Sequence, residues 1–297
     1  MKIAVEVSSE NCLSQQALPY TISKSMPRNI GREFNAIYGN EETIPVECKN
    51  QHLGMVLVRG LFGAWLPRHF ATPLCALRTA GWAAWIAPSS GTGNFTVNAA
   101  LLADFLTQGS LAQRSLILLC HSKGGLDALT MLASHPKIGG RIAALVFCQT
   151  PRGGCPLLED CFYSDPAQIK DQCFGAMLTV VRARSACVEL TGSAMQASLP
   201  QLESALPSAP LLSLASWSST PRFGIESQHS RMAKHAPNKL HDGLFFVEDQ
   251  LWHQGEQILL SEVDHSQPAL GGHGFRHDWL WTTLARLAAR RAGWVAA

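Results

Sequence analysis

The feature that most constrains the fold is a series of short apolar runs separated by longer stretches with helical periodicity. Such runs are typical of strands buried on both faces of a parallel sheet, and the stretches between them of the helices that cover it. Strands are expected at MVLVRG (55–60), WAAWIAP (82–88), SLILLC (115–120), AALVFCQT (143–150), PLLSLASW (210–217) and EQILLSEV (256–263). Helices are expected near 69–80, 97–108, 123–135 and 276–291. The sequence therefore predicts an α/β fold with a mostly parallel central sheet.

The domain organisation follows from these elements. A chain of 297 residues can form one α/β domain with insertions. Residues 1–53 are a mixed lead-in whose opening KIAVEV alternates like an edge strand, and 54–297 form the α/β domain. The interval of about 151–209 is too long for a plain loop and is amphipathic, so we expect a helical insertion. It would lie over the carboxyl edge of the sheet, where open α/β sheets bind ligands.

The composition excludes several classes of protein. Hydrophobic residues make up 46% and charged residues 15%, which is typical of a globular chain, and a net charge of +2 gives no reason to expect nucleic acid as a partner. No apolar window reaches membrane-spanning length, and the opening MKIAVEVSSENCL lacks the apolar core of a signal peptide. The odd count of 9 cysteines indicates reduced thiols. A cytoplasmic location is expected, although a chain with its signal removed would look the same.

The segment LILLCHSKGGLDAL (116–129) places Ser122 between a buried strand and a helix. A nucleophile on such a turn needs small neighbours because the turn is strained and tight, and Cys120, Gly124 and Gly125 are small. The helix that follows would aim free N–H groups and its positive dipole end at developing negative charge. The alternative is a serine that caps the helix of an ordinary βα unit.

Four segments carry a resemblance to a known family: VLVRGLFGAW (56–65), LLCHSKGGLDA (118–128), HDGLF (241–245) and EVDHSQP (262–268). They resemble the α/β-hydrolase superfamily, and within it the bacterial lipases and esterases whose nucleophile turn contains H-S-x-G-G. The resemblance spans most of residues 54–290 and implies the α/β-hydrolase fold, with helices on both faces of the sheet. It does not cover the lead-in or the insertion, which we expect from its own pattern to form a helical cap or lid. Cys120 departs from the G-x-S-x-G pattern, whereas Gly124 matches it.

The resemblance also implies an oxyanion hole. Arg59-Gly60-Leu61-Phe62-Gly63 is similar to the family's H-G-x-x-G segment. By that match the backbone N–H groups of Leu61 and Lys123 would stabilise the oxyanion. Arg59 in place of histidine leaves open how the loop is braced, and a glycine-rich turn after a strand is the alternative interpretation.

The family's order of nucleophile, acid and histidine identifies a candidate base. His265 follows the last expected strand, where the general base should fall, and would take the Ser122 proton. Because the chain has 11 histidines, a surface loop residue is the alternative. His273 and His277 are further candidates, whereas His121 is expected to be structural.

Asp242 is the candidate acid because HDGLF is similar to the N-D-G-L-V segment that carries the acid in bacterial lipases. It would fix the tautomer of His265. An Asp-Gly pair is also an ordinary turn signal, so Glu248 and Asp249 remain alternatives. Asp264 is poorly placed to bond the ring of the histidine that follows it.

No metal or cofactor is expected. Some bacterial lipases bind calcium through an aspartate two residues after the histidine, and here that position is Gln267. Cys155, Cys161, Cys173 and Cys187 lack C-x-x-C spacing and are read as buried thiols. No glycine-rich nucleotide-binding motif occurs.

The sequence thus predicts a serine hydrolase that cleaves small-molecule or lipid esters through an acyl-enzyme on Ser122. Alternatives are an acyltransferase or thioesterase with the same triad, or a ligand-binding protein that keeps the fold. Apolar residues of the insertion could line an acyl pocket, act as a lid or form a permanent cap: Phe174, Met177, Leu178, Val180, Val181, Val188 and Leu190. The acyl chain length and the oligomeric state are not predicted.

Overall fold

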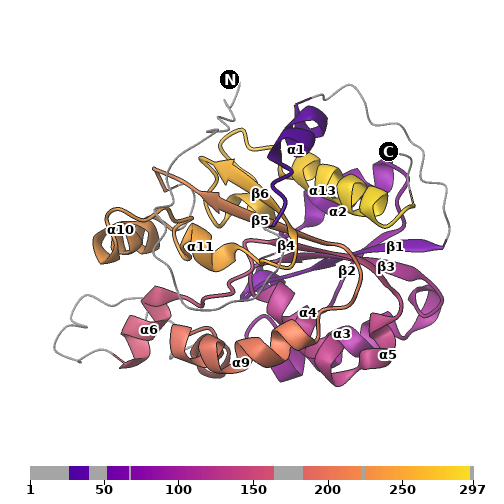
Figure 1. Cartoon of the computed structure of the whole chain (residues 1–297), viewed down its shortest axis with the longest axis horizontal. Coiled ribbons are helices and arrows are strands. Elements are labelled where there is room, and N and C mark those ends of the chain that lie inside the picture. The colour runs from indigo at the N-terminus through magenta and orange to yellow at the C-terminus, as the bar shows by residue number, and fades with distance from the viewer. Residues whose placement is uncertain (1–26, 40–51, 67, 164–182, 222–224, 295–297) are drawn as a thin grey trace.

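A six-stranded sheet forms the centre of the computed structural model, which describes residues 27–39, 52–66, 68–163, 183–221 and 225–294 (Figure 1). The strands lie in the order β2-β1-β3-β4-β5-β6, and each neighbouring pair is parallel. Their bounds are β1 Leu53–Val58, β2 Ala84–Ile86, β3 Ser115–His121, β4 Ile142–Cys148, β5 Leu211–Trp217 and β6 Glu256–Ser261. All six predicted strands and the α/β fold class are confirmed, with strand ends shifted by a few residues.

Helices cover both faces of the sheet (Figure 1). One face carries α1 Gly31–Tyr38, α2 Ala71–Thr79 and α13 His277–Arg291; the other carries α3 Phe95–Leu106 and α4 Lys123–Ser134. Strand β3 shows why two layers form, because alternate side chains point to opposite faces. Leu116 and Leu118 pack toward α3 and α4, whereas Ile117 and Leu119 pack toward α13. A strand buried on both faces therefore reads as a continuous apolar run.

The described part of the predicted 151–209 insertion is helical. It contains α6 Pro156–Tyr163, α8 Arg184–Glu189 and α9 Gly192–Ser204, and α9 packs on α4. Residues 164–182, with most of the apolar side chains expected to line a pocket, lie outside the described residues. The remaining short elements are η1 Gly63–Trp65, η2 Gly109–Leu111, α5 Pro136–Gly139, α10 Glu226–His235, α11 Val247–Gln250 and α12 Gln267–Leu270.

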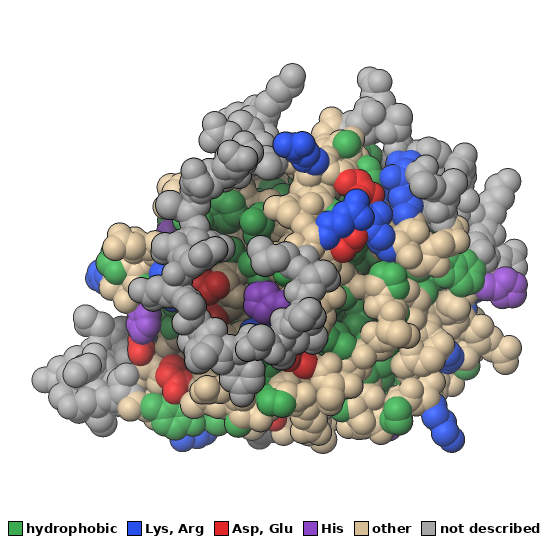
Figure 2. Space-filling view, in the orientation of Figure 1, with side chains coloured by type: hydrophobic (Ala, Val, Ile, Leu, Met, Phe, Trp, Pro, Cys, Tyr) green, Lys and Arg blue, Asp and Glu red, His purple; other side chains and the backbone are tan. Residues whose placement is uncertain are grey.

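The lead-in contributes a helix that the sequence pattern did not predict. The expected strand KIAVEV lies outside the described residues, but α1 packs on α13, and Asn29 forms a parallel bridge to Gln257 in β6. Arg291 of α13 pairs with Glu33 of α1 at 2.5 Å and with Glu256 of β6 at 2.6 Å. Figure 2 shows acidic and basic side chains side by side over these elements. Such partly exposed pairs add little stability each, but they tie both helices to the edge of the sheet.

The parallel arrangement decides where a site can form. Because every strand runs the same way, the loops that follow β1, β3, β4, β5 and β6 meet at one edge of the sheet. Across the described ranges, no helix combines the length and apolar character needed to cross a bilayer.

Candidate active site

Ser122 lies at the sharp turn between β3 and α4. Its backbone is in the left-handed region, with φ 54° and ψ −134°, which is uncommon for a residue with a side chain and costs roughly 1–3 kcal/mol. The Ser122 N–H donates to the carbonyl of Cys148 at 2.9 Å, so the end of β4 holds the turn in place. This is the strained strand-to-helix turn that the sequence predicted, and not the ordinary helix cap, because the Ser122 hydroxyl caps no N–H of α4.

Small residues allow this turn to sit against its neighbours. A Cβ on Gly124 would lie 2.6 Å from the carbonyl oxygen of Val58 and 2.7 Å from that of Arg59. A Cβ on Gly125 would lie 2.4 Å from Thr150 Oγ1. Cys120, which departs from the family pattern, is fully buried, and burial raises the pKa of its thiol well above the usual value. The cysteine therefore serves as a small apolar residue.

The structure brings Ser122, His265 and Asp242 into one chain of hydrogen bonds. His265 Nε2 lies 3.0 Å from Ser122 Oγ, and His265 Nδ1 lies 2.8 Å from Asp242 Oδ2. The three residues come from the loops after β3, before α11 and after β6, and all are buried. This geometry lets Asp242 fix the tautomer of the imidazole and lets Nε2 accept the serine proton.

The Asp-Gly turn at residue 242 also has a structural use. Asp242 Oδ1 accepts the N–H groups of Leu244 at 2.9 Å and Phe245 at 2.8 Å, and Gly243 adopts φ 104°. The carbonyl of Asp242 accepts the N–H of His265 at 2.8 Å. One carboxylate oxygen therefore shapes the turn, while the other faces the imidazole. The candidate acid is therefore also the residue that shapes the turn.

The alternative acids lie elsewhere. Glu248 is exposed and pairs with Lys239 at 2.6 Å. The Asp249 side chain approaches Gly153, and burial raises its pKa to about 6. Asp264 Oδ1 accepts hydrogen bonds from the backbone and hydroxyl of Ser266, so, as expected, it shapes the loop and not the imidazole ring.

The other candidate histidines take other positions. His273 is exposed, and His277 begins α13. His121 Nε2 lies 3.0 Å from Gln149 Oε1 and 3.1 Å from the carbonyl of His265. Burial lowers the pKa of His121 well below its ordinary value, so the ring stays neutral. His121 supports the loop that carries His265.

Gln149 is a site residue that the sequence reasoning missed. Fully buried at the end of β4, it donates to Ser216 Oγ at 2.6 Å and to the carbonyl of Asp264 at 3.1 Å while contacting His121. It therefore joins the ends of three strands to the histidine loop. No local pattern marks it, because its partners lie 28, 67 and 115 residues away.

Two backbone N–H groups at or beside the serine turn have no acceptor among the described residues. Among the described residues, the N–H groups of Leu61 and Lys123 make no hydrogen bond. A Cβ on Gly60 would lie 2.9 Å from Ser122 Cβ, so the Leu61 loop sits directly against the serine. These are the two donors that the resemblance implies for an oxyanion hole.

His69 supports the loop of residues 59–63, in which Arg59 stands where the family has a histidine. A Cβ on Gly63 would lie 2.9 Å from both Cε1 and Nδ1 of His69, so the imidazole packs closely against the loop at Gly63. The His69 side chain is 3% exposed, and burial, with the nearby charges of Arg59 and His265, lowers its pKa to about 3. A neutral ring from outside the motif thus supports the loop, which spacing alone could not reveal.

A cavity of about 400 Å³ opens at Ser122 and His265. Its described wall contains no Lys, Arg, Asp or Glu and is mostly apolar. The apolar side chains are Leu61, Phe62, Leu66, Leu158, Leu190, Ile225, Leu244, Phe245, Ala269 and Leu270. Leu158 and Leu190 come from the predicted insertion, together with the thiols of Cys155 and Cys187. Leu190 is thus the one described pocket residue among the apolar side chains expected there, since Val188 does not reach the cavity.

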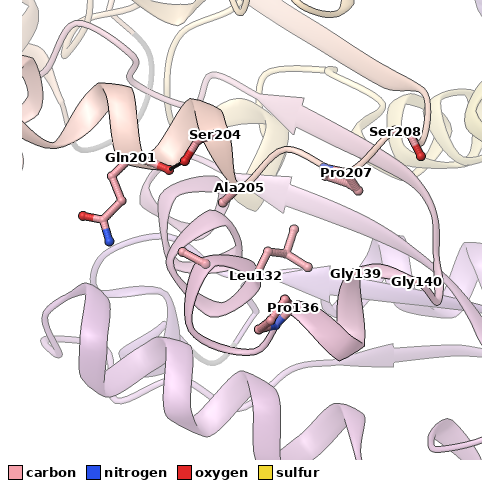
Figure 3. Close-up of a pocket in the computed structure, with 10 residues that line it drawn as sticks. Leu132, Pro136, Gly139, Gly140, Gln201, Ser204, Ala205, Pro207 and Ser208 are labelled. Carbon is pink, nitrogen blue, oxygen red and sulfur yellow. Dashed lines mark hydrogen bonds between the residues drawn. The ribbon is translucent and has the colours of Figure 1, made fainter.

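A second hollow lies beside the C-terminal end of α4, far along that helix from Ser122 (Figure 3). Its volume is about 550 Å³, and its lining includes Leu132, Pro136 and Gln201. Ser204 Oγ donates to the carbonyl of Gln201 at 2.7 Å, as drawn in Figure 3. The described lining of this hollow holds no charged side chain and no histidine.

The residues that could hold a metal are few. Gln267, in the position of the calcium-binding aspartate of some bacterial lipases, accepts the N–H of Asp264 through Oε1 at 3.0 Å. Within the described ranges, no three His, Cys, Asp or Glu side chains are grouped as metal ligands. The Gln267 amide instead closes the loop that presents His265.

Comparison with known proteins identifies the fold. No protein-family model and no curated protein sequence matches the chain. Among solved structures, a metagenomic carboxyl esterase, MGS0156, superposes with a TM-score of 0.70 at 18% identity, covering 89% of this chain and 92% of that chain. The mature Bacillus licheniformis lipase BlEst2 gives 0.61 at 18% identity, covering 83% and 94%. The Staphylococcus hyicus lipase gives 0.57 at 12% identity, covering 83% and 96%. The chain has the α/β-hydrolase fold.

Proposed function

We propose that the protein is a serine hydrolase that cleaves carboxylic esters through an acyl-enzyme on Ser122. The observation that carries this proposal is the hydrogen-bonded chain from Asp242 through His265 to a strained serine, beside two backbone N–H groups that have no acceptor among the described residues. A surface histidine or a helix-capping serine would not need this combination. The structural likeness to a carboxyl esterase and two lipases agrees with it.

The proposed reaction begins when Ser122 Oγ attacks the ester carbonyl carbon and His265 Nε2 takes the hydroxyl proton. The carbonyl oxygen becomes an oxyanion that accepts from the N–H groups of Leu61 and Lys123. The bond to the alcohol then breaks, and His265 returns the proton to the leaving oxygen. Water, deprotonated by the same imidazole, attacks the acyl-enzyme, and collapse of the second intermediate restores Ser122.

The electrostatics of the site favour this path. Each oxyanion donor in such enzymes contributes roughly 100- to 1,000-fold to kcat. The Lys123 amide is the first N–H of α4, a helix of 12 residues, so the positive end of the helix dipole adds to the field at the oxyanion. Asp242 stabilises the imidazolium formed after proton transfer, because its Oδ2 contacts Nδ1 directly.

The cavity supports an uncharged, apolar acyl group as the substrate class. Its described wall offers no cation or carboxylate to pair with a charged substrate, and apolar side chains from both the Leu61 loop and the insertion surround Ser122. Transfer of a hydrocarbon chain from water to such a wall contributes about 0.8 kcal/mol per methylene. Affinity should therefore rise with acyl length until the chain outgrows the cavity.

A panel of nitrophenyl esters of increasing acyl length tests the proposal. Wild-type protein should hydrolyse the panel with an optimum set by the cavity, whereas Ser122→Ala and His265→Ala should lose at least roughly 10³-fold in kcat. Hydrolysis by Ser122→Ala at the wild-type rate would refute it. Thr130→Val on α4 is a suitable control because, among the described residues, the Thr130 hydroxyl bonds only to the carbonyl of Leu126 in its own helix, at 2.9 Å.

A further inference from the structure

A charged pair lies buried directly behind the serine turn. Lys123 and Asp127 are one helical turn apart on α4, their side chains are 0% and 2% exposed, and the Lys123 ammonium contacts Asp127 Oδ1. The ammonium also lies 4.9 Å above the ring of Phe95. Burying two charges costs several kcal/mol of desolvation, and apolar residues of similar size are often as stable. Stability alone therefore does not explain this pair.

Asn98 extends the pair to another part of the chain. Its side-chain amide donates to Asp127 Oδ2 at 3.0 Å, and its carbonyl oxygen accepts the N–H of Ser90 at 3.0 Å. Asn98 is itself buried, in the first turn of α3. A single side chain thus connects the carboxylate behind the serine turn to the loop between β2 and α3.

The loop between β2 and α3 supports the segment that carries Leu61, the other proposed oxyanion donor. The carbonyl of Gly91, next to Ser90, accepts the N–H of Phe62 at 2.6 Å. Phe62 has φ 61°, a left-handed conformation that needs support, and it directly follows Leu61. The contacts therefore run without a gap from Lys123, through Asp127, Asn98 and the β2–α3 loop, to the residue beside Leu61.

We propose that the side chains of Lys123, Asp127 and Asn98 are positioning residues that fix the two amides of the oxyanion hole relative to each other. This inference rests on the proposed ester hydrolysis. The two amides come from segments about 60 positions apart. Close packing at Gly60 and Gly124 holds the two backbones against each other, and the side-chain contacts add a directional connection between them. Misplacement of a catalytic group by about 1 Å can cost roughly 100-fold in rate. The ionised pair with its hydrogen bonds is directional, which an apolar contact is not.

Asn98→Leu is the most direct test, because it keeps the branching and the number of side-chain heavy atoms and leaves the ion pair in place, but it removes both hydrogen bonds that connect the two halves. We expect kcat on nitrophenyl butyrate to fall roughly 10- to 100-fold with KM changed less than about 2-fold. The rate of inactivation by a fluorophosphonate should fall in parallel, since that reaction also builds charge on the oxygen in the hole. Thr130→Val on the same helix, outside these contacts, should leave both rates unchanged.

A double variant covers the case in which Asn98→Leu does not fold. Lys123→Met with Asp127→Leu removes both charges together and keeps both backbone amides, so no unpaired charge remains buried. It should fold, as judged by urea unfolding, yet show the same loss in kcat. Wild-type kcat in either folded variant, or a loss that only follows the unfolded fraction, would overturn the inference. Wild-type protein that neither hydrolyses esters nor reacts at Ser122 would overturn the proposed function as well, so the two failures are distinct.

Discussion

Gly124→Ala tests the packing of the serine turn against the end of β1 and the loop that carries Leu61. The added Cβ would meet two backbone oxygens, 2.6 Å away on Val58 and 2.7 Å away on Arg59, and neither can rotate aside as a side chain could. Ordinary van der Waals contact begins at 3.4 Å, so α4 and the end of β1 must separate by about 0.8 Å. That displacement acts directly between the segments that carry Lys123 and Leu61. We expect kcat to fall roughly 100-fold, as for other misplacements near 1 Å, with about 1–3 kcal/mol lost in the free energy of unfolding.

The assay is steady-state hydrolysis of nitrophenyl butyrate, combined with urea unfolding of the same preparation. Gly139→Ala is the matched control, because a Cβ there meets only Leu132 Cδ2 at 3.9 Å. The control should keep wild-type kcat and stability. A folded Gly124→Ala protein with wild-type kcat would refute the reasoning, since the turn would then tolerate the separation that the contacts forbid.

Three further predictions concern the surroundings of the site. His69→Phe should keep kcat within about 3-fold, whereas His69→Ala should lower kcat roughly 10-fold. The reason is that the ring packs on Gly63 and neither of its nitrogens has a described hydrogen-bond partner. An equal loss of kcat in both variants would contradict a packing role. Gln149→Leu should lower the free energy of unfolding in urea by about 2–4 kcal/mol, because it leaves buried polar groups unpaired; an unchanged midpoint would speak against its bridging role. At pH 8, iodoacetamide should modify the exposed Cys75 but spare Cys155 and Cys187, because burial raises the pKa of each pocket thiol to about 12. Peptide mass spectrometry follows the order of alkylation, and alkylation of either pocket thiol before Cys75 would contradict the prediction.

The strands and the serine turn could be predicted because their signals are local. A strand buried on both faces is apolar at nearly every position, so β3 can be predicted from its own residues. The turn at Ser122 needs small residues within a few positions, and Gly124 and Gly125 are visible in the sequence. Asp242 and His265 could be proposed only from the order of elements and from the family resemblance, since their contact spans 23 residues.

The remaining features depend on contacts that no local pattern encodes. The helix α1 is held by long-range packing on α13 and by Arg291, so its own segment gives little indication of it. Gln149 and His69 support loops that come into contact with them only in the folded chain. Neither residue belongs to a sequence motif that would indicate this contact. The i, i+4 spacing of Lys123 and Asp127 on a helix predicts that they pair. The burial of this pair depends on packing against α3 and cannot be predicted from the spacing.

The central claim is that Ser122 is a nucleophile activated by His265, and covalent labelling tests it most directly. Wild-type protein treated with a fluorophosphonate should gain one adduct by intact mass, mapped by peptide sequencing to Ser122. His265→Ala should label far more slowly, and Ser122→Ala should not label. Labelling of Ser122→Ala at the wild-type rate, or an adduct on another residue of the wild-type protein, would contradict the claim.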